Sequence, residues 1–495
     1  MTSALQSLPV LGLGLGIAGH EYDSRLDDPQ VRAHVDFVEP FDPELDFGEL
    51  ASRLPSSLSV SLHGSRLSPI STDPMPAELL AQTRAVADAL GAVWVVEDLA
   101  VWRLEGQVPV AGPFWPPVLD ERAVQLVARR HADLCAALGR PFLCELPPLP
   151  LEIGPLRPAE LFTALTEACG CGIVLDVSHW LVAAQLEGID PLECLDRLPL
   201  DHVVELHVSG GRRVPGPRWY DEEHGHDLLP ELVELVAHAI DRCPNLRSVV
   251  LECHSAQLPI VRRSLSALAA LPGIVALRAL AQSGRRCHRS PSPKTAVLER
   301  LGQPGPASLA AAQRQVRALL EEGERLRAHE SGALEVDQSL AAVPTAAWRE
   351  ASDRLLRQIR VLPPLADLLA CTVFGSREGA WREILAQRPA GSMGVPTKEE
   401  GFVALSTMPT LPAAVREAFA FLHDVSRVAN RGVPARPHGT RGPRLCVEYR
   451  HPVTAVVNAV LEGQPPPPPS PTTMSFHREG GKLSVRHAEP MEVAS

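Results

Sequence analysis

The sequence lacks three features that would each indicate a particular class of protein. It has no excess of positive charge, since its formal net charge is -12, whereas a nucleic-acid-binding protein generally carries a basic face. Its ten cysteines are scattered, and only Cys169 and Cys171 lie close together, which is too few for a disulfide framework. No stretch is long and apolar enough to cross a membrane. We therefore expect a cytoplasmic protein that binds neither nucleic acid nor membranes.

The N-terminal segment MTSALQSLPVLGLGLGIAGHEYD also lacks the pattern of a secretory signal. No basic segment precedes its apolar run, and the run is short and rich in glycine. We interpret it as a first strand. With 495 residues, of which 45% are hydrophobic, the chain can bury a large core and form two or three domains.

Apolar segments typical of buried strands alternate with helix-like segments over the first 280 residues. The expected strands lie at 9–17, 35–41, 58–64, 92–99, 140–147, 172–179, 202–210 and 246–254. The clearest helices lie between them at 77–91, 121–139 and 228–243. This alternation predicts an α/β fold, a TIM (β/α)8 barrel. An open doubly wound sheet is the competing architecture, but GLGLGIAG has neither the spacing nor the following helix of its phosphate-binding turn.

Six successive expected strands end in side chains that can bind a metal ion. These side chains are His63, Asp98, Glu145, Asp176 with His179, His207 and Glu252. In a barrel the carboxyl ends of the strands meet at one face, where active sites are built. Carboxylates packed this closely repel one another unless a cation holds them ionised. Mixed histidine and carboxylate ligation is typical of iron, manganese or zinc.

Single residues of this set also have plain structural interpretations. His63 can be a hydrogen-bonded core histidine, Asp176 can cap the following helix, and Glu145 can be a solvated loop residue. The convergence of all the strand ends is what favours a site.

The loop after the seventh strand, WYDEEHGHDLLPELVEL, adds His224 and His226. One residue separates them, so in an extended loop their side chains point the same way and can bind one ion. The alternative is a solvated acidic loop in which Asp227 caps the next helix.

Residues 9–265 resemble the DUF692 family, the multinuclear non-haem iron-dependent oxidative enzymes that include proteins of the methanobactin oxazolone synthase type. The segments that carry the resemblance are VDFVEP, SLHGSRLS, VVEDLAVW, LCELP, IVLDVSHWLVAAQLEGIDPLECL, VVELHVSGG, HGHDLLPELVEL and VVLEC. The resemblance implies a TIM barrel that holds two or three iron ions. It also implies that O2 is used to modify a ribosomally made precursor peptide, often at cysteine, which a partner protein or domain delivers.

The resemblance also implies roles for individual residues. The ligands of the two central irons would be His63, Glu145, Asp176, His207 and Glu252, and those around a third iron would be His179, His224 and His226. Glu145, Asp176 and His207 are the expected catalytic residues. Asp98 stands where the family commonly has a histidine, and as a harder ligand it would favour ferric iron.

Two further motifs depart from the family pattern. His224-Gly225-His226 stands where the family commonly has Asp-x-His, which keeps two ligands but loses an anion. The sixth strand continues as Val177-Ser178-His179 where the family often has Val-Asn-Asn.

The chain beyond residue 281 is expected to form a separate module. Residues 282–294 are basic and rich in serine and proline, which is typical of a linker. Helical spacing at 306–329, 347–362, 380–387 and 412–430 predicts a mainly α-helical domain over 295–462. Its role is open between substrate recognition and a module for dimerisation or stability. Residues 463–495 begin with a polyproline run and are expected to be a disordered tail.

Three functions remain open from the sequence. The first is iron- and O2-dependent oxidation of a ribosomally synthesised peptide. The second is a barrel like those of sugar isomerases or endonucleases, which would use manganese or zinc as a Lewis acid without redox chemistry. The third is a degenerate barrel that serves as a peptide-binding or metal-sensing scaffold, for which Asp98 is the best support.

Overall fold

The computed structural model describes residues 5–18, 22–41, 48–109, 114–216, 218–282, 295–321, 323–357, 364–386, 398–431, 444–479 and 482–487. The chain divides into two compact units. The first consists of Met1–Gly106, Pro113–Arg317 and Glu335–Trp348, and the second of Gln107–Gly112, Ala318–Leu334 and Arg349–Ser495.

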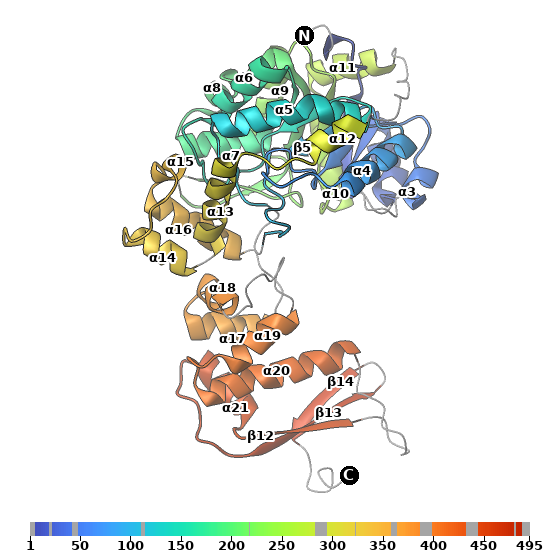
Figure 1. The fold of residues 1–495 in the computed structure, drawn as a ribbon. Helices are drawn as coiled ribbons and strands as arrows, with labels where there is room; N and C mark the ends of the chain where they lie inside the picture. The colour runs from blue at the N-terminus through green and yellow to red at the C-terminus, as the bar shows by residue number, and fades with distance from the viewer. Residues whose placement is uncertain are drawn as a thin grey trace. The chain divides into compact units, whose positions relative to one another are not determined.

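A closed barrel of parallel strands forms the centre of the first unit (Figure 1). Its strands are β1 (Gly12–Ala18), β2 (Phe37–Phe41), β3 (Ser59–Val60) continued by β4 (Leu62–Gly64), β5 (Val95–Asp98), β6 (Phe142–Glu145), β7 (Gly172–Asp176), β8 (Val203–Ser209) and β11 (Ser248–Glu252). Because β1 pairs in parallel with both β2 and β11, the sheet closes on itself. The predicted TIM barrel is confirmed.

Helices follow the strands and cover the outside of the barrel (Figure 1). They are α2 (Pro29–His34), α3 (Gly48–Arg53), α4 (Ala77–Leu90), α5 (Glu121–Leu138), α6 (Pro158–Cys169), α7 (Val177–Glu187), α8 (Pro191–Asp196), α9 (Pro230–Arg242), α10 (Leu258–Ala269) and α11 (Pro272–Gln282). A short hairpin of β9 (Gly211–Arg213) and β10 (Tyr220–Glu222) follows β8. No single helix in the described part of the chain is long and apolar enough to cross a membrane; α10 and α11 reach that length only together, bent by 90°.

Packing explains the glycines of the first strand. A Cβ on Gly14 would lie 2.4 Å from the Phe37 ring, and one on Gly16 would lie 3.0 Å from Nε2 of His254. Phe37 belongs to the apolar core, with Trp94, Val96, Leu143, Val174, Val204 and Val250. The glycines of β1 thus make room inside the barrel, and this close packing accounts for a pattern that superficially resembles a phosphate-binding turn.

The first unit extends further along the chain than the sequence predicted. Helix α12 (Thr295–Leu301) and most of α13 (Ala307–Glu321) belong to it. Gln313 is buried, accepts hydrogen bonds from N and Oγ1 of Thr72 at 3.0 and 2.9 Å, and donates to the Ile70 carbonyl at 2.8 Å. These bonds tie α13 to the loop after β4. Helical spacing predicts where a helix lies but does not reveal which domain it contacts, so the predicted boundary at residue 295 differs from the observed one.

The second unit is mainly helical, as expected, and also contains a small sheet. Its helices include α14 (Gly323–Glu330), most of α16 (Thr345–Arg357), α17 (Pro364–Phe374), α18 (Arg377–Ala386), α19 (Lys398–Thr407), α20 (Ala413–Arg431) and α21 (Val453–Leu461). The antiparallel sheet consists of β12 (Arg444–Tyr449), β13 (Thr472–Glu479) and β14 (Lys482–His487).

Two segments of the C-terminal half, the proline-rich tail and the linker, were expected to lack regular structure. The prolines at 465–469 have no regular structure, but residues 472–479 and 482–487, expected to be disordered, form β13 and β14. The β-branched and aromatic residues of TTMSFHRE suit a strand, and the adjacent proline run obscured that signal. The expected linker, 282–294, lies outside the described residues except for residue 282, which ends α11.

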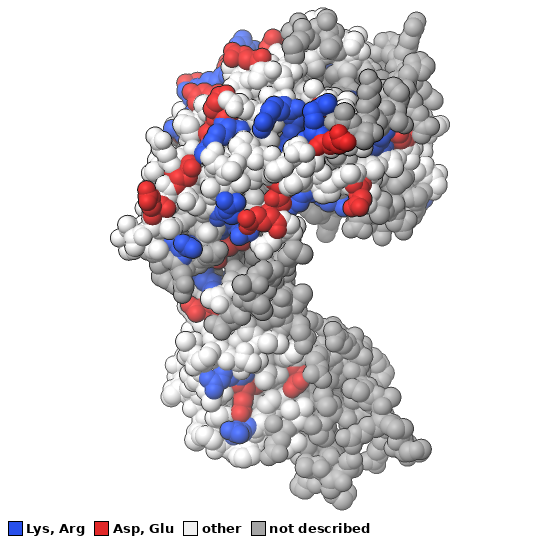
Figure 2. All heavy atoms as spheres, viewed as in Figure 1, with Lys and Arg blue, Asp and Glu red and all other residues white. Residues whose placement is uncertain are grey.

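Charges of both signs lie on the outer surface of the first unit. On the face drawn in Figure 2, basic side chains gather over α5 and α12, with acidic side chains beside them. Arg300 of α12 pairs with Asp133 of α5.

Candidate metal centre

The carboxyl ends of the barrel strands bring histidines and carboxylates into one buried cluster. Among the residues that the structure describes, four groups of three have ligand atoms within 4.8 Å of one another: His63, Glu145 and His207; Glu39, His207 and Glu252; Asp98, Glu145 and His179; and Asp176, His179 and Glu222. Glu145, His179 and His207 each belong to two groups, so the four groups are contiguous.

Glu145, the last residue of β6, connects the cluster. Its Oε2 lies 3.0 Å from Nε2 of His63, and its Oε1 lies 3.3 Å from Nδ1 of His207 and 3.5 Å from Nδ1 of His179. Burial favours the neutral acid, but His207 and His63 outweigh it and lower the pKa of Glu145 to about 2. A fully buried anion between three imidazoles can contact more than one cation.

Asp176 uses its two oxygens for different purposes. Its Oδ1 accepts hydrogen bonds from the backbone N–H of Ser178 and of His179, at 2.6 and 3.0 Å, and so caps α7. This cap ends β7 at residue 176, before the predicted end at 179. Its Oδ2 has no hydrogen-bond partner and lies 3.8 Å from Nε2 of His179. The capping and metal-binding interpretations of Asp176 are therefore compatible.

Backbone carbonyls fix the orientation of two histidines. Nδ1–H of His63 donates to the Gly64 carbonyl at 2.8 Å, and Nδ1–H of His179 donates to the Leu146 carbonyl at 2.6 Å. A carbonyl oxygen only accepts, so each Nδ1 carries the proton and each Nε2 faces carboxylates. Metal-binding histidines are held in this way, with the second nitrogen hydrogen-bonded to a nearby acceptor.

The charges of the cluster favour the binding of a cation. Burial opposes a charged His63, but Glu145 and its acidic neighbours outweigh this and raise the pKa of His63 to about 10. Burial and Glu145 together raise the pKa of Asp98 to about 7. Oδ1 of Asp98 and Oε1 of Glu145 have no hydrogen-bond partner although both atoms are buried. Since unpaired buried carboxylates are costly, these nitrogen and oxygen donors fit a metal centre.

The hairpin after β8 completes the outer side of the cluster. Oε1 of Glu222 in β10 lies 3.0 Å from Nε2 of His224 and 3.4 Å from Nε2 of His179. The hydroxyl of Ser209 donates a hydrogen bond to the same oxygen at 2.8 Å. On its other side, His224 contacts His254, with the two Nδ1 atoms 3.3 Å apart.

His226, which the sequence paired with His224, lies apart from the cluster. Its side chain is 47% exposed, and its Nε2 lies 3.2 Å from Glu223. The backbone N–H of His226 donates to the Glu223 carbonyl at 3.1 Å, so the chain turns here and the alternation of an extended loop does not apply. Glu97, beside Asp98, also has a different role, because its oxygens accept hydrogen bonds from the backbone of Leu67 and Ser68.

Two members of the cluster were not among the residues predicted from sequence. Glu39 lies in the middle of VDFVEPF, and an acid within an apolar strand is a signal that could have singled it out. Glu222 lies in the run DEEHGH, where spacing alone does not distinguish one acid from its neighbours.

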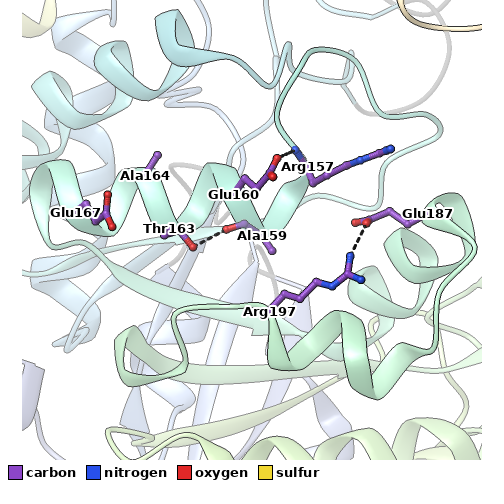
Figure 3. Close-up of a pocket in the computed structure, with 8 residues that line it drawn as sticks. All are labelled: Arg157, Ala159, Glu160, Thr163, Ala164, Glu167, Glu187 and Arg197. Atoms are coloured by element: carbon purple, nitrogen blue, oxygen red, sulfur yellow. Dashed lines mark hydrogen bonds and ion pairs between the residues drawn. The ribbon is translucent and has the colours of Figure 1, made fainter.

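A surface pocket lies elsewhere, on the outer layer of helices. Figure 3 shows it lined by residues of α6 and by Arg157, Glu187 and Arg197. Arg197 pairs with Glu187, and Arg157 pairs with Glu152. None of the clustered ligands lines this pocket, so we place the candidate site in the barrel.

A buried set of histidines and carboxylates at the carboxyl ends of a closed parallel barrel defines a (β/α)8 protein with a candidate metal centre. Residues 12–271 match the family described as RiPP precursor modification enzyme MbnB/TglH/ChrH, where RiPP denotes a ribosomally synthesised and post-translationally modified peptide, and the chain belongs to this family.

Two bacterial relatives of known sequence are UPF0276 proteins. One from Acaryochloris marina is 31% identical over 189 residues, which cover 37% of this chain and 66% of the relative. One from Rhizorhabdus wittichii is 30% identical over 224 residues, which cover 42% of this chain and 80% of the relative.

Among solved structures, a xylose isomerase domain containing protein from Salmonella typhimurium matches with a TM-score of 0.37 and 17% identity, over 53% of this chain and 99% of its own. The TTHB071 protein from Thermus thermophilus, soaked with ZnCl2, matches with a TM-score of 0.33 and 21% identity, over 55% of this chain and 99% of its own.

Proposed function

We propose that this protein is an iron-dependent enzyme that uses O2 to oxidise a ribosomally made precursor peptide at a cysteine. Membership of a RiPP precursor modification family supports the peptide substrate. The observation that carries the proposal is the sharing of Glu145 between two groups of potential ligands, because a shared carboxylate suits neighbouring metal ions.

Three neighbouring ion positions follow from the groups. His63, Glu145 and His207, with Glu252, would hold one ion, and Asp98 and Glu145 would contribute to a second. Asp176, His179 and Glu222, with His224, would hold a third, because the Nδ1–H of His179 donates to Leu146 and only its Nε2, which faces Asp176 and Glu222, can bind an ion. When bound, iron would supply redox chemistry with O2 and would lower the pKa of a substrate thiol.

The residues of the chain would bind and shield the reacting groups. Glu145 and His207 have no exposed side-chain surface, so bulk water is excluded around them. The side chain of His224 is 30% exposed, which makes its side of the cluster the more open one. We therefore infer that a peptide cysteine approaches past His224.

We assign precursor recognition to the second unit, within the expected 295–462 domain. A recognition unit on the same chain would raise the effective concentration of bound peptide at the barrel, to about the millimolar range for a short tether. A chain ending at Arg357, which retains α12 and α13, tests this role. It should need a higher concentration of full-length precursor, while a short core peptide is processed as before. An unchanged KM for the full-length precursor would favour dimerisation or stability as the role of this unit.

A search for a gene for a short cysteine-bearing peptide beside this one, followed by co-expression of any such peptide with this protein, tests the proposed reaction. We expect an O2-dependent mass change that maps to a cysteine and is absent when Glu145→Ala replaces the wild type. Zinc or manganese in place of iron, with no change in the peptide, would instead support a Lewis-acid barrel. A protein without bound metal would support the scaffold alternative.

A further inference from the structure

His207 of β8 has carboxylates beside both of its ring nitrogens. Its Nδ1 lies 3.3 Å from Glu145 and 3.3 Å from Glu252, on the side of the candidate metal centre. Its Nε2 lies 3.1 Å from Oε1 of Glu39 and 3.4 Å from Oε1 of Glu205. The ring is fully buried, so its orientation must be set by these neighbours.

Glu205 and Glu39 differ in how their oxygens are used. Both oxygens of Glu205 accept hydrogen bonds, one from Trp94 Nε1 at 3.1 Å and one from Ser248 Oγ at 2.5 Å. Glu39 accepts from Ser61 Oγ through Oε2 at 2.8 Å, while its Oε1 has no hydrogen-bond partner. Nε2 of His207 has none either. The unpaired oxygen of Glu39 is thus the acceptor available to the unpaired nitrogen of His207.

We propose that Glu39 is a positioning residue that accepts the Nε2–H of His207 and so directs Nδ1 toward the metal ion bound with His63 and Glu145. A neutral imidazole binds a metal through one nitrogen and carries its proton on the other, so an acceptor at the second nitrogen fixes both tautomer and ring orientation. This inference rests on the proposed function, because it assigns a role within the proposed metal centre.

Direct metal binding by Glu39 is the competing role, since Glu39, His207 and Glu252 have ligand atoms within 4.8 Å of one another. The contacts favour positioning. Glu252 approaches Nδ1 of His207, whereas Glu39 approaches Nε2, so the two carboxylates approach different nitrogens of the ring. A metal bound at Nδ1 leaves Nε2–H free to donate to Glu39.

Titration of the full-length metal-free chain with Co2+, in competition with a chelator, tests the proposal through affinity and the visible absorption of the ion. Glu39→Gln and Glu39→Leu should bind as many ions as the wild type, with one ion bound about 10–100-fold more weakly. Glu39→Gln should be the less affected, because its amide oxygen still accepts the N–H. Loss of a whole ion in Glu39→Gln, as expected for His207→Ala, would make Glu39 a ligand and overturn the proposal.

The unfolding temperature of the metal-free variants separates positioning from a structural role. Glu39 repels the neighbouring Glu205 but attracts His207, so its neutralisation in Glu39→Gln should change this temperature little while Co2+ affinity falls. A lower unfolding temperature with unchanged Co2+ affinity would overturn the proposal.

Ser61→Ala, which keeps the carboxylate but removes its hydrogen bond, is the matched control and should weaken Co2+ binding less. Failure of the wild type to bind any metal would overturn the proposed function itself, whereas unchanged Glu39 variants beside a metal-binding wild type would overturn only this inference.

Discussion

Nε2 of His63 and Oε2 of Glu145 lie 3.0 Å apart, although the two residues are 82 positions apart in the sequence. His63 lies in β4 and Glu145 ends β6, and only the closed barrel brings the two side chains together. The contact places an imidazole against a carboxylate whose other oxygen faces two further histidines. We therefore predict that Glu145 contributes to the binding of more than one metal ion.

Replacement of Glu145 should release more bound metal than replacement of Asp176. Glu145→Ala removes a donor from two groups and should release ions from both, whereas Asp176→Ala affects one. Each affected ion should bind at least about 100-fold more weakly, more than the roughly 10–100-fold expected for a residue that only orients a ligand. Metal analysis after gel filtration measures the loss, and both variants should remain folded by circular dichroism.

Glu193→Ala is the matched control for these two variants. Glu193 is 60% exposed and pairs with Arg197 on the surface, so its removal should leave the metal content unchanged. Full metal content in both Glu145→Ala and Asp176→Ala would show that these carboxylates are not ligands.

The two histidines of the HGH motif should differ in effect. His224 contacts Glu222 at 3.0 Å beside the third group, whereas His226 is 47% exposed and contacts Glu223. His224→Ala should reduce the metal content by one ion and slow peptide processing, and His226→Ala should leave both unchanged. Equal losses of metal in the two variants would contradict the geometry of this loop.

Metal binding should release protons at neutral pH. In the metal-free protein, burial opposes charge on both His63 and His224, but Glu145 raises the pKa of His63 to about 10 and Glu222 raises that of His224 to about 9. Both pKa values lie above the ordinary 6.5, so both rings are protonated at pH 7 and a metal must displace those protons. Affinity should therefore rise as the pH increases from 6 to 9, by up to about tenfold per pH unit for each displaced proton.

Calorimetric titration in two buffers of different ionisation enthalpy counts the released protons. A binding enthalpy that does not depend on the buffer would mean that these histidines do not give up protons to the metal.

Gln313 should stabilise the barrel, although it lies beyond residues 12–271, which match the family. Gln313→Ala would leave Thr72 N–H and the Ile70 carbonyl without a buried partner, at a cost of roughly 3 kcal/mol in the free energy of unfolding. Gln303→Ala, an exposed glutamine of the same segment, is the control and should change this free energy little. Urea denaturation measures both. If the two variants are equally stable, α13 does not brace the loop after β4.

The barrel was predictable because each strand carries its own signal. The short apolar run of 172–176 and the helical spacing of 121–138 are local patterns, and both elements were found within a few residues. Local patterns also placed most candidate ligands, because parallel strands bring their carboxyl ends to one face.

The contacts that depend on tertiary structure were not predictable in this way. Glu39 lies inside a strand, and its approach to His207 follows from closure of the barrel. The separation of His226 from His224 follows from one turn, and the hydrogen bonds that Gln313 of α13 makes to the loop after β4 join segments about 240 residues apart. A truncation at the predicted boundary after Ala281 would therefore remove part of the first unit.

Iron quantification of the full-length protein, purified without oxygen after expression with added iron, tests the central claim most directly. The contiguous groups around Glu145 predict two or more iron ions per chain. The Glu145→Ala variant should lose most of this iron. Less than one iron ion per chain under these conditions would contradict a multinuclear iron centre.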